Sequence, residues 1–370
     1  METEAAILWE THGDWSVEEI ELDPPRAGEV LLEMKASGMC HSDEHLRTGD
    51  MPFPPPIVGG HEGAGVVVEV GPEVSWLQPG DHVVGAFIPA CGRCPSCASG
   101  HSNLCDLGAQ LGSRGQLSDG TARHHARGQD LATMCLLGTF ARHTVVNEAS
   151  CIKIDDGWPL DKACLLGCGV VTGWGSSVYA AGTGPADTIV VVGFGGIGAS
   201  AVLGAVSAGA KQIVVVDPVA SKRERALRLG ATHVAATMTE ARPLVQEITW
   251  QRMANQLVLC MGVGDGQQLA DALALVGKRG RVVVTNIHPA MEISAMVSLM
   301  DLTLHEKAVV GSLFGSGNPR ADIPKLLELY AAGALPLDDL VTNTYPLKSI
   351  NDGYEDMRNG TNIRGVLVYD

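Results

Sequence analysis

The sequence predicts an α/β protein with two domains, a mostly β domain and a domain built on a doubly wound parallel sheet. The chain has 370 residues, and at about 150 residues per domain this length favours two domains. Up to about residue 170 the chain reads as short strands separated by turns. Beyond that point apolar strands alternate with helical segments, which is typical of βαβ units and a parallel sheet covered on both faces.

Alternation and turn residues define the β-rich half. Residues 30–36 alternate apolar and polar side chains, as a half-buried strand does. Residues 65–70 form a second expected strand, ended by a Gly-Pro pair, and residues 82–86 form another after a Pro-Gly-Asp turn. Residues 52–56 are rich in proline and are expected to be rigid and extended. We therefore expect a mostly antiparallel β domain.

The second half alternates strands and helices. The expected strands are residues 188–192, 212–216, 257–261 and 281–285, and the expected helices are residues 199–208, 222–229 and 266–276. A further apolar strand is expected at residues 307–314. Helices near residues 323–332 and 350–358 and a last strand at residues 365–369 complete the chain.

A glycine motif follows the first of these strands. Residues 188–192 run directly into G-x-G-x-x-G, and a helix-compatible segment follows it. Gly193 permits a tight turn, Gly195 lets the backbone approach a pyrophosphate, and Gly198 lets helix and strand pack closely. The phosphates would lie at the helix N-terminus, where free N–H groups point outward. This context predicts dinucleotide binding, with a glycine-rich turn that holds no ligand as the alternative.

An acidic residue stands at the distance that such a site requires. Asp217 ends the next strand, nineteen residues after Gly198. A carboxylate there accepts bonds from the adenosine ribose hydroxyls and repels a 2′-phosphate. Lys222, five residues further on, is either a second ribose contact or a solvated helix residue.

Four cysteines are clustered within fifteen residues. Their spacing is Cys91-x2-Cys94-x2-Cys97-x7-Cys105, and C-x2-C steps place sulfurs around one tetrahedral ion. Four protein ligands leave no open position, so the spacing predicts a structural zinc site. Two disulfides or an iron–sulfur cluster are the alternatives.

A second group of metal-binding side chains is scattered along the chain. Cys40 opens the run Cys-His-Ser-Asp-Glu-His, His61 and Glu62 follow Gly60, and Cys168 stands between two glycines. Each of these alone reads as an ordinary buried residue. Together, two thiolates and an imidazole form a three-ligand set that leaves a fourth position open, which is typical of catalytic zinc.

These motifs, in this order, resemble those of the zinc-dependent medium-chain alcohol dehydrogenases over essentially the full chain. Within that family, residues 40–45, 87–94 and 134–140 resemble the actinobacterial nicotinoprotein branch, the N,N-dimethyl-4-nitrosoaniline-dependent enzymes. The resemblance implies a GroES-like catalytic domain over residues 1–169, completed by residues 313–370, and an NAD-binding Rossmann domain over residues 170–312. The branch implies a nicotinamide cofactor that stays bound and is recycled in place by a second substrate or carrier.

The resemblance also implies the metal ligands and the residues around them. The catalytic zinc would be held by Cys40, His61 and Cys168, and the structural zinc by Cys91, Cys94, Cys97 and Cys105. Asp43 would accept a bond from His61 and fix its tautomer, and Glu62 would approach the metal during ligand exchange. Ser42 would pass the substrate proton toward a ribose hydroxyl of the cofactor and on to His45.

Cofactor contacts are implied in the same way. His41 stands where the family often has an arginine that faces the cofactor phosphates, and an imidazole binds phosphate less firmly than a guanidinium. The implied cofactor-binding residues are His41, Thr172, Gly193, Gly195, Gly196, Ile197, Gly198, Asp217, Lys222 and Arg364. Four other cysteines match no ligand position and are expected to be ordinary buried residues: Cys135, Cys151, Cys164 and Cys260.

The implied reaction is hydride transfer from a primary alcohol to NAD, giving an aldehyde, or the reverse. Zinc would act as a Lewis acid that lowers the pKa of the alcohol, and the nicotinamide would take the hydride. Two alternatives stay open: a glutathione-dependent formaldehyde dehydrogenase of the same architecture, and a zinc- and nucleotide-binding protein without turnover. A basic rim would be needed for glutathione, and the chain has few basic residues.

The composition of the chain argues against some classes of binding partner. With 42 acidic and 26 basic residues the net charge is −16, and aromatic residues make up 4%, which argues against nucleic acid and anionic membranes. The uncharged stretches at residues 165–186 and 189–210 have membrane-spanning length, but their glycine content favours buried strand and helix. The N-terminus lacks a basic signal region, so we expect a cytoplasmic protein. The strand near residues 309–313 resembles the family's dimer segment and predicts a homodimer or homotetramer.

The alcohol itself is not predicted. Pocket walls in this architecture come from scattered loops, including residues 112–137. This segment contains several basic side chains, expected as solvated surface or as a polar wall: Arg114, Arg123, His124, His125 and Arg127.

Overall fold

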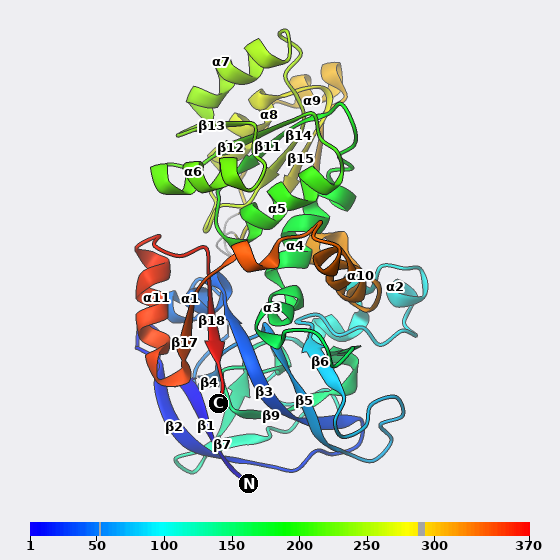
Figure 1. Cartoon of the computed structure of the whole chain (residues 1–370), viewed down its shortest axis with the longest axis vertical. Helices are drawn as coiled ribbons and strands as arrows, with labels where there is room; N and C mark the ends of the chain where they lie inside the picture. Colours follow the sequence, from blue (N-terminus) through cyan, green and yellow to red (C-terminus); the bar gives the residue numbers. More distant parts are fainter. Residues whose placement is uncertain (52, 288–292) are drawn as a thin grey trace. The chain divides into compact units, whose positions relative to one another are not determined.

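The computed structural model describes residues 1–51, 53–287 and 293–370, and the chain divides into two compact units (Figure 1). The first unit consists of Met1–Cys168 and Asn318–Asp370, and the second of Gly169–Gly317. Pro52, the first residue of the proline-rich segment expected to be extended, lies outside the described residues.

The first unit is built from a closed barrel and an adjoining sheet, nearly all antiparallel, as predicted for the first half of the chain. The barrel contains β1 (Glu2–Leu8), β2 (Ser16–Leu22), β7 (His124–Ala126), β8 (Gln129–Thr133) and β4 (Ile57–Val58). The sheet runs β10 (Cys151–Ile154), β6 (His82–Gly85), β5 (Gly63–Val70), β3 (Glu29–Met39), β18 (Arg364–Val368) and β17 (Val341–Pro346), with β9 (His143–Asn147) also pairing with β3. Among the described strands of this first unit, only the β4–β8 and β17–β18 pairs are parallel.

The alternating strand β3 holds this unit together. Its side chains Leu32 and Met34 are buried in one apolar core with Val67 of β5 and Val83 of β6. The helices of the unit are α1 (His41–Thr48), α2 (Pro95–Ala98), α3 (Leu160–Ala163), α10 (Pro319–Ala331) and α11 (Ile350–Arg358). The C-terminal strand β18 pairs antiparallel with β3, so the end of the chain lies inside the sheet.

The second unit is a doubly wound parallel sheet, as predicted. Its strand order is β13 (His233–Ala235), β12 (Gln212–Val216), β11 (Thr188–Val192), β14 (Ala254–Leu259), β15 (Val276–Val284) and β16 (Ala308–Gly311). Neighbouring strands are parallel throughout. The helices are α4 (Gly169–Gly175), α5 (Gly196–Ser207), α6 (Ala220–Arg228), α7 (Met238–Ile248), α8 (Gly266–Leu275) and α9 (Leu299–His305).

The central strands are apolar because both faces of the sheet are covered. Every residue of β11 is buried, and a parallel sheet covered by helices needs such continuous apolar runs. β14 and β15 begin earlier than expected, at Ala254 and Val276, where a bulge interrupts the β14–β15 pairing. An Asp265 and Gln268 capping box fixes the start of α8.

The two uncharged stretches have different positions in the fold. Residues 189–210 form the buried strand β11 and most of α5, as expected. Among the described residues, no single helix combines the length and apolar character needed to cross a membrane. One bent pair, Leu160–Gly167 with Gly169–Ala180, meets that test on length and composition alone.

Candidate metal and cofactor sites

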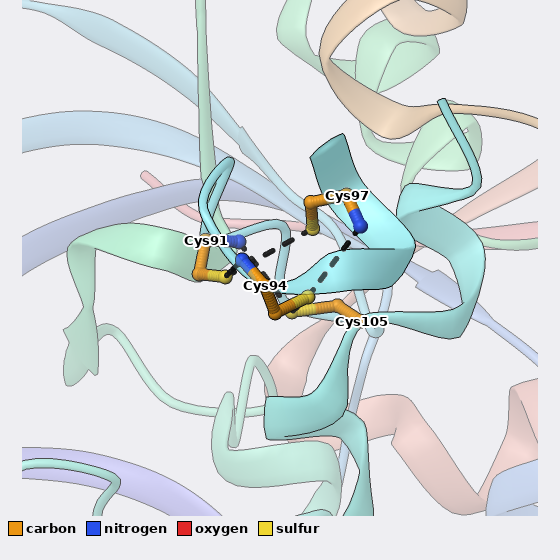
Figure 2. A group of neighbouring side chains, drawn as sticks. All are labelled: Cys91, Cys94, Cys97 and Cys105. Carbon is orange, nitrogen blue, oxygen red and sulfur yellow. Dashed lines mark hydrogen bonds between the residues drawn. The ribbon is translucent and has the colours of Figure 1, made fainter. Parts of the chain in front are cut away.

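The four clustered cysteines converge on one point of the first unit (Figure 2). Their sulfur atoms all lie within 4.8 Å of one another. The Sγ atoms of Cys91 and Cys97 are 3.9 Å apart, and so are those of Cys94 and Cys105. A disulfide needs about 2.05 Å between sulfurs, so these distances exclude the disulfide alternative.

The separation between the sulfurs matches a tetrahedral zinc site. Four sulfurs at about 2.3 Å from a central zinc have edges of about 3.8 Å. Backbone N–H groups point at the sulfurs: Cys94 N lies 3.3 Å from Cys91 Sγ, and Cys97 N lies 3.4 Å from Cys94 Sγ. Pro95 starts α2 and Cys94 caps it, so this short helix turns Cys97 back toward Cys91. The donor set therefore fits zinc.

Local charge differs among these thiols. Burial raises the pKa of Cys105 to about 12. Burial acts in the same direction on Cys91, but N–H groups of Arg93 and Cys94 outweigh it and lower the pKa of Cys91 to about 7. Four thiolates this close together repel one another, so a cation is needed to hold all of them deprotonated.

The scattered second group also comes together, entirely within the first unit. Ligand atoms of Cys40, His61, Glu62 and Cys168 lie within 4.8 Å of one another, and all four side chains are buried. Cys40 lies between β3 and α1, His61 and Glu62 lie between β4 and β5, and Cys168 ends the first segment of the unit. The fold thus assembles two thiols, an imidazole and a carboxylate from three loops.

The His61 ring is oriented for a metal. Its Nδ1 atom lies 3.1 Å from Oδ2 of Asp43. This distance is short enough for an ion pair, but the two atoms are not aligned for a hydrogen bond. The other carboxylate oxygen of Asp43 accepts the N–H of Gly60 at 2.8 Å, which fixes the carboxylate. The Nε2 atom of His61 is buried and has no hydrogen-bond partner among the described residues, so a ligand at that nitrogen would satisfy it.

Charge in this group is unevenly shared. A hydrogen bond from Cys168 lowers the pKa of Cys40 well below its ordinary value, and that same bond and burial raise the pKa of Cys168. Burial acts to lower the pKa of His61, but Asp43 and Cys40 outweigh it, so the pKa lies well above its ordinary value. This concentration of buried negative charge around an imidazole suits a divalent cation.

Glu62 has a partner that the sequence did not indicate. Its carboxylate forms a buried ion pair with Arg364, the first residue of β18. Burial acts to lower the pKa of Arg364, but the charges of Glu62 and Cys40 outweigh it, so the pKa lies above its ordinary value. A Cβ at Gly38 would lie 2.9 Å from Leu165 Cδ2, 3.0 Å from Arg364 Nη2 and still closer to the Glu62 carboxylate. The absent side chain at Gly38 therefore makes room for the pair.

Replacing Gly38 by alanine tests this packing. We expect Gly38→Ala to displace Glu62 and Arg364, lowering kcat/KM for an alcohol by roughly 10-fold, as for other groups next to a metal ligand. Zinc content should stay unchanged, since no ligand is removed. Gly157→Ala is the matched control, because a Cβ at Gly157 meets nothing within 4 Å. Equal activity in the two variants would contradict the assigned role of Gly38.

The predicted proton-relay residues lie on α1. Ser42 and His45 are one turn apart and therefore on one face of the helix. The Oγ atom of Ser42 lies 3.7 Å from the sulfur of Cys40. His45 is buried, and its Nδ1 lies 3.2 Å from Oδ2 of Asp50. The sequence did not indicate Asp50, which gives the buried imidazole a carboxylate partner.

Two further features of α1 surround these residues. His41 is exposed at the first position of the helix, and its ring centroid is 6.4 Å from that of His45. Glu44 is buried and pairs with Arg47 at 2.7 Å and with Arg358 of α11 at 3.3 Å. The sequence did not indicate these pairs, which attach α1 to the C-terminal segment.

The glycine motif forms the expected turn at the start of α5. Gly193 has φ +91°, and a Cβ there would lie 2.7 Å from the backbone of Met261. A Cβ at Gly198 would collide with the carbonyl oxygen of Gly193, whereas at Gly195 nothing lies within 4 Å. Gly195 therefore faces open space, as the predicted close approach of a pyrophosphate requires. Gly196 and Ile197, in the first turn of α5, are half-buried.

The end of β12 carries the predicted ribose contact. Asp217 is buried, and its carboxylate accepts N–H bonds from Phe194 at 2.8 Å and Val219 at 2.9 Å. It thus joins the glycine turn to the end of β12. Lys222 is half-buried in the first turn of α6. Arg223, which the sequence did not indicate, donates to the carbonyl oxygen of Asp217 at 2.7 Å.

Thr172 also has features of a ligand contact. It lies in α4 and is 6% exposed, and its hydroxyl has no hydrogen-bond partner among the described residues. A buried hydroxyl without a partner is costly, so a bound molecule at this position would satisfy it.

The expectation of solvated surface is wrong for two residues of segment 112–137. Arg123 and His124 are 1% and 0% exposed. Arg123 is neutralised by buried Glu29 at 2.7 Å, a partner distant in sequence. Burial lowers the pKa of His124 to about 3, so the imidazole is neutral, and its Nε2 lies 3.3 Å from the Thr144 hydroxyl.

The other basic residues of this segment lie at the surface. Arg114 and Arg127 are exposed, and His125 is half-buried beside Asp130 at 2.8 Å. The four cysteines that matched no ligand position are all buried, as expected: Cys135, Cys151, Cys164 and Cys260.

Comparison with protein families gives two matches that together cover most of the chain. The family described as "Alcohol dehydrogenase GroES-like domain" matches residues 26–156. The family described as "Zinc-binding dehydrogenase" matches residues 196–332. The first match contains Cys40, His61 and the four clustered cysteines, and the second match begins within the glycine motif.

Individual relatives agree with these families. The chain is 50% identical over 370 residues to alcohol dehydrogenase B of Mycobacterium tuberculosis, covering 100% of this chain and 99% of the relative. It is also 50% identical over 369 residues to the NDMA-dependent alcohol dehydrogenase of Amycolatopsis methanolica, covering 100% and 99%. NDMA is N,N-dimethyl-4-nitrosoaniline.

A solved structure has the same fold over its whole length. Benzyl alcohol dehydrogenase of Acinetobacter calcoaceticus superimposes with a TM-score of 0.91 at 31% identity, covering 100% of both chains. Fold, ligand chemistry and relatives agree that the chain is an oxidoreductase that acts on alcohols with zinc and a nucleotide cofactor. It belongs to the zinc-dependent medium-chain alcohol dehydrogenases, in the branch that includes the NDMA-dependent enzyme of Amycolatopsis methanolica.

Proposed function

We propose that the enzyme oxidises a primary alcohol to an aldehyde at the site formed by Cys40, His61 and Cys168. The observation that carries this proposal is the buried cluster of two thiols and an imidazole, whose Nε2 atom has no partner among the described residues. Bound zinc would lower the pKa of the alcohol and bound NAD would accept its hydride. The alcohol loses two electrons and one hydrogen as hydride, and its hydroxyl proton must leave separately.

Residues of α1 provide the route for that proton. Ser42 lies beside Cys40 and accepts the hydroxyl proton from the substrate. His45, paired with Asp50, would receive that proton, and a bound cofactor would supply a ribose hydroxyl for the relay. Asp43 keeps the His61 ring in one orientation, and Arg364 balances the charge of Glu62.

A second zinc is proposed for Cys91, Cys94, Cys97 and Cys105. The 3.9 Å separations between sulfurs and the convergent N–H groups support it. Because this set is closed, it stabilises the loop between β6 and β7 and does not bind substrate.

The nicotinamide cofactor is proposed to be NAD. The Asp217 carboxylate stands at the end of β12 beside the glycine turn, where its charge disfavours a 2′-phosphate. The proposed contacts are the glycine turn itself with Gly196 and Ile197, and the side chains His41, Thr172, Lys222 and Arg364.

Asp217→Ser should weaken the choice between the two cofactors. The variant removes the repulsion of the 2′-phosphate, and we expect the ratio of NAD to NADP affinity to fall by roughly 10-fold. Fluorescence titration of the cofactor-free protein with each nucleotide measures this ratio. If the original protein bound NADP as tightly as NAD, Asp217 would not set the preference.

We further propose that the cofactor is retained and is reoxidised in place by an external acceptor. Support comes from the 50% identity to the NDMA-dependent relative. Adding a primary alcohol to purified protein without free NAD should raise absorbance at the NADH band by one equivalent per site. Sustained turnover should then require NDMA. Protein that carries no nicotinamide but turns over steadily with added NAD would overturn retention and leave the zinc site unaffected.

A homodimer is proposed through the edge of the parallel sheet. β16 is the edge strand and, among the described strands, pairs only with β15. Val309 and Leu313 beside this edge are exposed, as are Leu299 and Met300 of α9. A second copy related by a two-fold axis would cover these side chains and extend the sheet. Pairing of dimers would give a tetramer.

The proposed location is the cytoplasm. All ten cysteines are free thiols, and seven of them belong to the two metal-binding groups. Thiols stay reduced in a cytoplasmic environment, which suits zinc ligands.

A further inference from the structure

A cleft lies in the second unit, at the amino-terminal ends of its strands. Its volume is about 930 Å³, and Thr188, Gln212, Ala254 and Val276 line it. These are the first residues of β11, β12, β14 and β15. The glycine turn follows the carboxyl end of β11, so the cleft lies at the opposite edge of the sheet. None of the residues assigned to zinc or the dinucleotide lines it.

The cleft is basic although the chain is acidic. Lys211, Arg242, Arg252, Lys278 and Lys307 line it together with a single carboxylate, that of Asp301. The whole chain has 42 acidic and 26 basic residues, so an average region of this surface carries more acids than bases. A cluster with the opposite balance concentrates anions locally.

Helix ends account for only one of these cations. Helix C-termini carry partial negative charge and attract basic side chains. Lys307 fits this role, because its Nζ donates to the carbonyl oxygen of Leu273 at 2.8 Å and pairs with Asp301 at 2.9 Å. Asp301 also pairs with His305 at 2.7 Å. The carboxylate of the cleft is therefore occupied by two partners.

The other four cations have no such partner. Within the described residues, the side chains of Lys211, Arg242, Arg252 and Lys278 form no hydrogen bond or ion pair. Elsewhere most arginines and lysines are paired, as Arg123 is with Glu29. Four uncompensated cations around one cleft repel one another, and a bound anion removes that repulsion.

An exposed tryptophan stands beside these cations. Trp250 is 70% exposed, and its ring centroid is 5.0 Å from Lys211 Nζ and 5.3 Å from Arg252 Cζ. Trp250 and Gln251 both have positive φ, 50° and 65°, a conformation that costs energy in residues other than glycine. The turn after α7 thus holds an indole and two cations at the cleft.

We propose that this cleft binds a small polyanion that carries two or more phosphate or carboxylate groups. Arg242 and Lys278 bind the anionic groups, and Lys211 and Arg252 complete the positive rim around Trp250. Exposed cations in water give modest affinity individually, so several charges on one ligand are needed. This second ligand site is separate from the alcohol and dinucleotide sites.

The test uses enzyme saturated with NAD, so that phosphates cannot bind at the glycine turn. Inorganic pyrophosphate and citrate are titrated separately by calorimetry and by tryptophan fluorescence. We expect at least one of them to bind with one equivalent per chain and to change the emission. Arg242→Gln with Lys278→Gln should weaken that binding at least 10-fold, and Trp250→Phe should remove the emission change while calorimetric binding remains.

The control is a double variant that removes two cations elsewhere in the same unit. Arg225→Gln with Arg228→Gln removes two cations from α6 that do not line the cleft, and binding should change less than 2-fold. Lys211→Gln is a second variant at the cleft, should the first pair unfold. No binding of either anion, or equal weakening in the cleft and control variants, would overturn the proposal.

Discussion

Cys168→Ala is expected to abolish alcohol oxidation while the protein stays folded. The variant removes one thiolate of the proposed catalytic set, which lies within 4.8 Å of the other ligand atoms. Loss of a group that only orients a ligand costs roughly 10- to 100-fold, so loss of a ligand itself should exceed about 100-fold in kcat. Elemental analysis should give one zinc per chain, where two are expected for the original protein.

Cys164→Ala is the matched control for this variant. Cys164 lies four residues earlier, is also buried and belongs to neither metal-binding group. The control should keep both zinc ions and its activity, with a cost of about 1 kcal/mol in unfolding free energy. If Cys168→Ala kept two zinc ions or turned over normally, the catalytic site would be wrongly assigned.

Cys97→Ala is expected to damage stability before activity. A structural zinc contributes directly to folding, and loss of a metal belongs to the most destabilising class of changes, about 4 kcal/mol. For a unit of this size the melting temperature should fall by roughly 10 °C. Calorimetry and zinc analysis on the same sample measure both quantities.

Cys151→Ala separates zinc loss from the loss of a buried sulfur. Cys151 is buried in the core of the same unit and lies outside the cysteine cluster. It should retain two zinc ions and melt within a few degrees of the original protein. Similar melting temperatures for the Cys97 and Cys151 variants would mean that the four-cysteine group does not stabilise the fold through a metal.

Short-range patterns made much of the fold and the four-cysteine group predictable, whereas the scattered set of Cys40, His61 and Cys168 was predicted by combining distant motifs and from the family resemblance. Cys91 to Cys105 lie on one loop, where spacing alone limits how the sulfurs meet. The run from β11 through the glycine motif is similarly local, because the strand, turn and helix that hold a dinucleotide are consecutive. Continuous apolar runs such as residues 188–192 identified the parallel sheet in the same way.

Partners distant in sequence were not predictable. Arg364 meets Glu62 across 302 positions, and Arg123 meets Glu29 across 94. An isolated arginine such as Arg123 is expected at the surface, because burying its charge is costly without a partner, and nothing local reveals the partner of either arginine. The role of Gly38 was not predictable from the sequence either, because it depends on side chains from distant positions that fill the space a Cβ would take.

The placement of β18 between β3 and β17 has a consequence for synthesis on the ribosome. The second unit is continuous in the chain, from Gly169 to Gly317, and can fold as soon as it emerges. The first unit cannot close its sheet until residues 364–368 have been made. Until then Glu62 has no Arg364 beside it, so the charge-balanced zinc pocket is one of the last features to mature. A chain cut short before residue 364 would have a finished nucleotide fold and an unfinished metal site.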